Sequence, residues 1–210
     1  MVLSLPRMTI DDRYGEFVTV PRAVRFPVEL FPPRGFDPGS AETWPKVEGR
    51  LEYVSGRLLY MPPCGDVQGA TVADVVGVLM PWVRAHPDFL VETNEAGMRL
   101  GEDSRGADAA IWRRNEAGRF TGGFRRVPPL LAVEVAGEDE PEVVLRAKAD
   151  WYLRLGVRVV WLVLPEPREV VVLTAAGVTR HHATETLPTQ PELPDLTVPV
   201  SALFQQISAQ

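Results

Sequence analysis

The segment from residue 130 to residue 165 constrains the fold most, because two apolar runs flank a stretch with helical character. The runs "LLAVEVA" (130–136) and "VRVVWLVLP" (157–165) are apolar at most positions, as in strands covered on both faces. The stretch between them, "PEVVLRAKADWYLRLG", opens with Pro141 and Glu142 and closes at Gly156, which are typical helix boundaries. This order predicts a strand–helix–strand unit in an α/β domain with a mixed central sheet.

Further elements are predicted on both sides of this unit. Strand-like runs around Ser55-Gly56 predict a hairpin over 50–62. The spacing of apolar residues predicts a helix over 67–86, which Pro81 should kink or shorten. The other predicted elements are strands in 89–94, 97–100 and 106–112, a hairpin over 168–183 that turns near Gly177, and a last helical turn over 200–204. Residues 1–45 are rich in proline and predict an irregular arm, which leaves 46–210 as the folded domain.

Composition and charge exclude several classes of protein. Lys and Arg total 22 against 28 Asp and Glu, and the net charge of −6 argues against a broad basic surface for nucleic acid. A local group of arginines could still contact DNA phosphates, or could lie on a solvated hairpin. These arginines are Arg113, Arg114, Arg119, Arg125 and Arg126. No apolar run of about 18 residues predicts a membrane helix, and the single cysteine, Cys64, favours a reducing cytoplasm.

Common catalytic motifs are missing from the sequence. It has neither a phosphate-binding P-loop nor a dinucleotide-binding glycine motif. The histidines, His86, His181 and His182, do not have zinc-ligand spacing with Cys64. No serine or cysteine occupies a recognisable nucleophile motif. The acidic residues are therefore the more informative candidates.

Glu134 is the residue that the apolar pattern explains least, because an unpaired carboxylate in a covered strand costs free energy. Asp108 lies near the start of another predicted strand, and Glu52 lies inside the first hairpin. If these carboxylates converge at one edge of the sheet, they need a cation between them, and oxygen ligands favour Mg²⁺ or Mn²⁺. Lys148, on the predicted helix, could then hold a water molecule or offset charge on a phosphate.

Each of these residues also has a purely structural interpretation. Asp108 could simply end a strand, Glu52 could be an exposed strand position, and Lys148 could be a surface lysine. A structural ion pair could compensate Glu134 without any metal.

Four segments in order along the chain resemble the Uma-type restriction endonuclease family, a branch of the PD-(D/E)XK nuclease superfamily. They are "RLEYVSGRLLYMPP", "GADAAIW", "PPLLAVEVAGED" and "AKADWYLRLGVRVVWLVLPEPREVVVL". The resemblance extends from about residue 49 to residue 175. It implies a restriction-endonuclease-like fold, with a mixed central sheet flanked by helices.

The resemblance also implies an activity, the hydrolysis of DNA phosphodiester bonds, and a set of site residues. Mg²⁺ or Mn²⁺ would be held by Asp108, Glu134 and the backbone carbonyl of Val135, with Lys148 as the lysine of the motif and Glu52 as a further acidic residue. In the usual pattern the lysine stands two residues after the glutamate, where this chain has Ala136. The lysine would therefore come from the helix. Cleavage of both DNA strands favours a homodimer.

Three positions depart from the family pattern. Ala107 replaces the usual proline before the aspartate, Gln68 stands where a histidine is common, and the serine after the glutamate strand is replaced around Gly137. Two alternatives therefore stay open beside an active nuclease. One is a catalytically weak or inactive module that binds nucleic acid or protein, and the other is an unrelated α/β protein with Glu134 in an ion pair.

Overall fold

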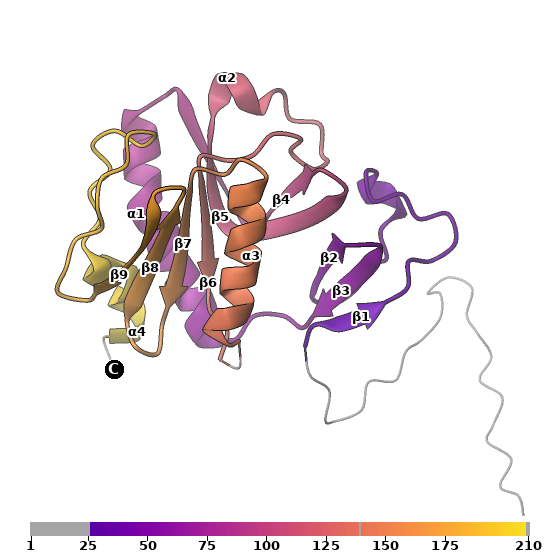
Figure 1. The fold of residues 1–210 in the computed structure, drawn as a ribbon, viewed down its shortest axis with the longest axis horizontal. Helices are drawn as coiled ribbons and strands as arrows, with labels where there is room; N and C mark the ends of the chain where they lie inside the picture. Colours follow the sequence, from indigo (N-terminus) through magenta and orange to yellow (C-terminus); the bar gives the residue numbers. More distant parts are fainter. Residues whose placement is uncertain (1–25, 139, 209–210) are drawn as a thin grey trace, which may run out of the picture.

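A computed structural model describes residues 26–138 and 140–208 of the chain (Figure 1). These residues form a mixed sheet flanked by helices, which confirms the predicted fold class. Most of the predicted arm, residues 1–25, lies outside the described part.

Nine strands of the described residues hydrogen-bond into one sheet. Their order is β1-β3-β2-β5-β6-β7-β8-β9, and β4 also pairs with β5. The strands are β1 (Val28–Leu30), β2 (Arg50–Val54), β3 (Arg57–Met61), β4 (Phe89–Leu100), β5 (Asp103–Arg113), β6 (Leu131–Val135), β7 (Val159–Leu164), β8 (Glu169–Thr174) and β9 (Gly177–His182). β6 and β7 are parallel, and the other strand pairs are antiparallel. The predicted strand–helix–strand unit is therefore confirmed inside a mostly antiparallel sheet.

Two long helices cover opposite faces of this sheet. They are α1 (Asp66–Ala85) and α3 (Glu142–Arg154). Alternate residues of β5 point to opposite faces, so Ile111 belongs to the apolar core under α1 and Trp112 to the core under α3. In Figure 1, α3 lies in front of the sheet and α1 behind it. The shorter helical segments are α2 (Arg114–Ala117), α4 (Gln205–Ser208) and the 3₁₀ turns η1 (Ala41–Thr43) and η2 (Val200–Phe204).

Strands β4 and β5 form a long antiparallel ribbon that carries an irregularity. The sequence predicts two separate strands over 89–94 and 97–100, whereas the structure has one strand with a register shift between Thr93 and Ala96. Within the shift, Asn94 and Glu95 both have a φ angle of 59°. Such left-handed backbone is uncommon for residues other than glycine. The irregularity turns the Glu95 side chain toward β2 and β5.

Two other predictions differ from the structure. α1 is not shortened by Pro81 but continues to Ala85, because Trp82 and Val83 beyond the proline are buried in the core. The part of the arm that is described is not entirely irregular, since β1 joins the sheet as an edge strand beside β3. The boundary predicted at residue 45 therefore does not separate β1 from the domain.

Candidate active site

Asp108 and Glu134 lie opposite one another on neighbouring strands. The antiparallel register pairs Ala109 of β5 with Val133 of β6, which puts these carboxylates across from each other on the face that α3 covers. Asp108 Oδ2 accepts a hydrogen bond of 2.7 Å from the backbone N–H of Val135. Both side chains are buried, with 7% and 3% of their residue surface exposed.

Lys148 of α3 joins three acceptors from three strands. Its Nζ donates to Glu134 Oε2 at 2.9 Å and to the backbone carbonyl of Gly106 at 2.8 Å, and it lies 2.9 Å from Glu52 Oε1. Lys148 and Glu52 are both buried, so neither is the exposed residue that its structural interpretation allowed. The structure therefore brings together all four predicted side chains.

Tyr152, one helical turn after Lys148, completes the shell around Glu134. Its hydroxyl lies 2.6 Å from Glu134 Oε1 and 3.1 Å from the Gly106 carbonyl. Both oxygens of Glu134 are thus bound by side chains of α3. The helical spacing of Lys148 and Tyr152 was visible in the sequence, but the contact of the hydroxyl with Glu134 was not predicted.

Two arginines and a third glutamate surround this centre, and no pattern in the sequence distinguishes them. Arg105 Nε donates to Glu52 Oε2 at 2.8 Å. Arg50 Nη1 donates to Glu95 Oε1 at 3.0 Å and lies 3.7 Å from Asp108 Oδ1. Arg50 and Arg105 occupy strand positions that look ordinary in the sequence, and Glu95 depends on the register shift in β4.

One lysine, Lys148, is paired with two buried carboxylates, and this sets which of the two carries a proton. Burial raises the pKa of Glu134 to about 8, and the negative charges of Asp108 and Glu52 add to the rise against the effect of Lys148. Burial alone would also raise the pKa of Glu52, but Lys148 and Arg105 lower it below its ordinary value. Glu52 is therefore the ionised partner, and Glu134 retains a proton near neutral pH.

The other ionisable groups fit this distribution. Burial raises the pKa of Asp108 to about 6, and the charge of Glu95 contributes, against the hydrogen bond from Val135. Burial would lower the pKa of Lys148, yet its two glutamates raise it above the ordinary value. The metal-free centre thus keeps its lysine charged and is short of positive charge beside Asp108 and Glu134.

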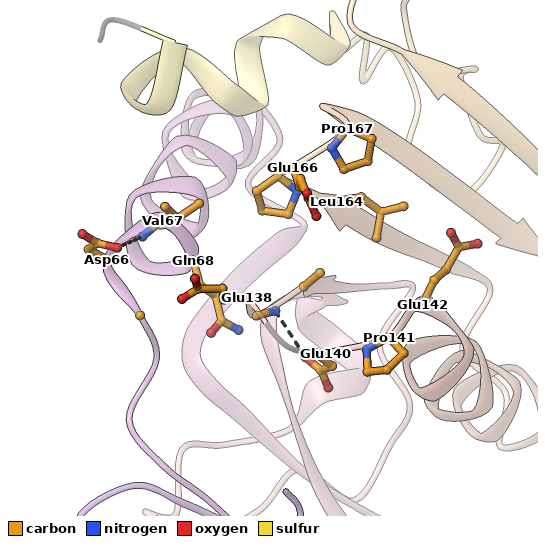
Figure 2. A pocket seen from close by; sticks show the side chains of 14 residues that line it. Asp66, Val67, Gln68, Glu138, Glu140, Pro141, Glu142, Leu164, Glu166 and Pro167 are labelled. Atoms are coloured by element: carbon orange, nitrogen blue, oxygen red, sulfur yellow. Dashed lines mark hydrogen bonds between the residues drawn. The ribbon is translucent and has the colours of Figure 1, made fainter. Parts of the chain in front are cut away.

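Gln68 of α1 reaches the same centre from the other face of the sheet. Its Nε2 donates to the backbone carbonyl of Val135 at 2.9 Å. Gln68 also lines a cavity of about 880 Å³ between the first turns of α1 and α3 (Figure 2). The acidic residues that line this cavity are Asp66, Glu138, Glu140, Glu142 and Glu166. No basic side chain lines it among the described residues, so the cavity is an unfavourable path for a phosphate.

The predicted DNA-contacting arginines have different environments. Arg125 is buried, where its guanidinium pairs with Glu92 and donates to the Ala117 carbonyl at 2.9 Å. Arg114 donates hydrogen bonds of 2.9 Å to the backbone carbonyls of Pro87 and Phe89, at the start of β4. Arg126 is exposed and donates to the Gly39 carbonyl at 2.8 Å, and the half-buried Arg113 lies 3.5 Å from Glu116, so both keep further N–H donors for phosphates.

The chemistry of the centre suits a hard cation, although the acidic side chains do not enclose one by themselves. Within residues 26–138 and 140–208, no three His, Cys, Asp or Glu side chains are grouped so as to hold a metal ion. Two carboxylates and the Val135 carbonyl are nevertheless the oxygen ligands that Mg²⁺ or Mn²⁺ prefers, and Mg²⁺ commonly keeps several water ligands. No helix of the described residues is both long and apolar enough to cross a membrane.

Comparisons with known proteins associate this fold with nucleases. The model of a family called Uma2, described as "Putative restriction endonuclease", matches residues 40–201. Among solved structures, the chain is similar to "a putative nuclease belonging to DUF820" from Anabaena variabilis ATCC 29413, with a TM-score of 0.69 and 18% sequence identity. That similarity covers 78% of this chain and 94% of the other. No curated protein matches the chain. At this identity the solved structure supports the fold alone.

Proposed function

The chain belongs to the Uma2 family of "Putative restriction endonuclease" proteins, and we propose that it is a divalent-metal-dependent endonuclease that hydrolyses DNA phosphodiester bonds. The observation that carries the proposal is the pairing of Asp108 and Glu134 on adjacent strands with Lys148 beside them. Family membership removes the alternative of an unrelated α/β protein.

Asp108, Glu134 and the backbone carbonyl of Val135 would hold Mg²⁺ or Mn²⁺. The raised pKa values of Asp108 and Glu134, about 6 and about 8, support this assignment, because they mark two buried carboxylates without enough compensating charge. When bound, the ion would polarise the phosphodiester and activate a water molecule as the nucleophile.

The other groups of the centre would supply positive charge to the phosphate and hold the side chains of the site in position. Lys148 stays protonated between Glu134 and Glu52, so it would supply positive charge to the phosphate as negative charge develops on it. Glu52 would keep the lysine in place through one carboxylate oxygen, while its other oxygen is paired with Arg105. Tyr152 would fix the orientation of the Glu134 carboxylate.

Cleavage of supercoiled plasmid with Mg²⁺ or Mn²⁺ tests this function. We expect nicking or linearisation by the wild type and losses of about 10²-fold or more in Asp108→Ala and Lys148→Ala. Glu102→Gln is the matched control, because Glu102 is a 98% exposed carboxylate on the β4–β5 turn, and it should cleave like the wild type. Equal cleavage by Asp108→Ala and the wild type would contradict the proposal.

A second candidate is a catalytically weak or inactive member that binds nucleic acid or protein. It is favoured by one observation, that Lys148 and Tyr152 bind both oxygens of Glu134 and could leave no need for a metal. An inactive wild type that still binds duplex DNA would support this candidate.

The biological setting is proposed on the same basis. Paired cleavage of two DNA strands would use a homodimer. A cytoplasmic location suits both a DNA substrate and the exposed single cysteine, Cys64. Size-exclusion chromatography with light scattering would test the dimer.

A further inference from the structure

Arg50, at the start of β2, brings a further cation to the centre without being bound to the carboxylate that it faces. Its Nη1 is 3.0 Å from Glu95 Oε1 but 3.7 Å from Asp108 Oδ1. The second distance is beyond a hydrogen bond. The guanidinium therefore faces Asp108 while Glu95 holds it.

The Nη groups of Arg50 keep unused hydrogen-bonding capacity. Nη2 has a weak acceptor, the sulfur of Met61 at 3.7 Å. Nε is buried and has no hydrogen-bond partner within the described part of the chain. A guanidinium has five N–H donors in a planar fork that matches the oxygens of a phosphate. Nε is enclosed by the protein, so it is the remaining Nη donors of this half-buried side chain that a phosphate oxygen could reach.

The backbone around Glu95 is built to hold Arg50 in this position. Asn94 and Glu95 both adopt left-handed φ angles of 59° at the register shift of β4. On β5, a Cβ atom on Gly106 would lie 3.0 Å from Glu95 Oε2 and 3.1 Å from Glu95 Cβ, so a side chain there would displace the glutamate. Strained backbone of this kind persists where the surrounding structure fixes it, often at functional sites.

The charges on the two sides of the centre indicate where a phosphate could approach. The cavity on the α1 side is lined by five acidic residues and by no basic one among those described. Arg50 stands on the β2 side, and its side chain is 16% exposed beside the 32% exposed side chain of Glu95. An anionic substrate would therefore find on the β2 side a cation that the lining of the α1-side cavity does not offer.

We infer that Arg50 binds a non-bridging oxygen of the phosphodiester next to Asp108, and that Glu95 is its positioning residue. The inference rests on the proposed function, because that function supplies the phosphate. A purely structural role, in which Arg50 only neutralises Asp108 and Glu95, predicts a loss of stability without a loss of phosphate affinity.

The affinity for thymidine 3′,5′-bisphosphate, measured by calorimetry in the presence of Ca²⁺, separates these roles. Ca²⁺ replaces the catalytic ion, so that binding is measured without cleavage. We expect Arg50→Gln to bind the bisphosphate about tenfold or more weakly, and Arg50→Lys to lie between it and the wild type, since lysine keeps the charge but not the fork. Arg57→Gln is the control on the adjacent strand, where Arg57 packs on the Phe31 ring, and it should bind like the wild type. Mn²⁺ affinity in Arg50→Gln should be unchanged or higher, because a cation beside Asp108 is removed.

A double-mutant cycle tests the role of Glu95. Glu95→Gln should weaken bisphosphate binding when Arg50 is present. The same substitution should have little further effect in the Arg50→Gln background, because Glu95 acts through Arg50. Thermal unfolding establishes that each variant is folded, and Arg50→Lys carries the test if Arg50→Gln is not.

The outcomes separate this inference from the proposed function. Bisphosphate affinity equal in Arg50→Gln and the wild type, or no binding by the wild type, overturns the role of Arg50. Plasmid cleavage by the wild type would keep the nuclease function even then. An inactive wild type that binds the bisphosphate through Arg50 would keep the inference and remove the nuclease function.

Discussion

Lys148 Nζ lies 2.9 Å from an oxygen of each of two buried glutamates, and one ammonium group cannot neutralise both. Glu52 has a second cation in Arg105, whereas Glu134 has the neutral hydroxyl of Tyr152. The proton on Glu134 follows from this difference. Lysine 148 is thus the residue on which the charge of the whole centre depends.

Removing this lysine should cost more stability than replacing Glu134 by its neutral amide. Lys148→Met leaves the buried, ionised Glu52 with Arg105 as its remaining cation and removes a hydrogen-bond donor from Glu134, and it should lower the free energy of unfolding by about 3–5 kcal/mol. Glu134→Gln should be much milder, because the glutamate already carries a proton. Urea unfolding of the two variants measures the difference. A larger loss in Glu134→Gln than in Lys148→Met would contradict this assignment.

The stability of the metal-free protein should fall as the pH rises. Unfolded Glu134 titrates at its ordinary pKa of 4.5, whereas burial raises the pKa in the folded protein to about 8. Between these values the folded state binds more protons, so raising the pH favours the unfolded state. We expect the free energy of unfolding in EDTA to be lower at about pH 8 than at about pH 5, with a smaller decrease in Glu134→Gln. The same slope in both proteins would show that Glu134 is ionised throughout.

The register shift in β4 places Glu95 against Gly106 of β5, where there is no room for a larger side chain. Gly106→Ala should displace Glu95 and lower the free energy of unfolding by about 1–3 kcal/mol. Gly77→Ala, at an exposed position of α1 with no atom within 4 Å of the new Cβ, should instead stabilise the protein by about 0.5–1 kcal/mol. Thermal or urea unfolding of both variants tests the contrast, and a neutral Gly106→Ala would show that Glu95 can move freely.

The sequence predicts the elements better than it predicts their contacts. The apolar runs of β6 and β7 and the boundaries of α3 follow from local pattern, and so does the position of Glu134 inside a covered strand. The pairing of Asp108 with Glu134 depends on the register between two strands that are far apart in the chain. Glu95 was missed because its place depends on two successive left-handed residues, and only Asn94 is of a type that favours them.

A protein with a net charge of −6 would have to hold DNA with few accessible cations. Arg113→Gln and Arg126→Gln should each reduce the slope of log affinity against log salt concentration by about 1. Arg125→Gln should instead lower stability, because it removes the ion-pair partner of Glu92 on β4. Fluorescence anisotropy with duplex DNA over a range of salt concentrations measures the slopes. Unchanged slopes in the first two variants would place the DNA on another surface.

The sequence separations within the centre also set the order in which it can form. Lys148 and Glu134 are 14 residues apart and belong to one strand–helix unit, whereas Arg105 and Glu52 are 53 residues apart and join different hairpins. Contacts between distant segments form late, because loop closure costs entropy before it brings any contact. The β2–β3 hairpin, which carries Glu52, should therefore join the centre after α3 has packed beside β6. A nuclease built in this way would acquire its ability to cut DNA only when the domain is complete.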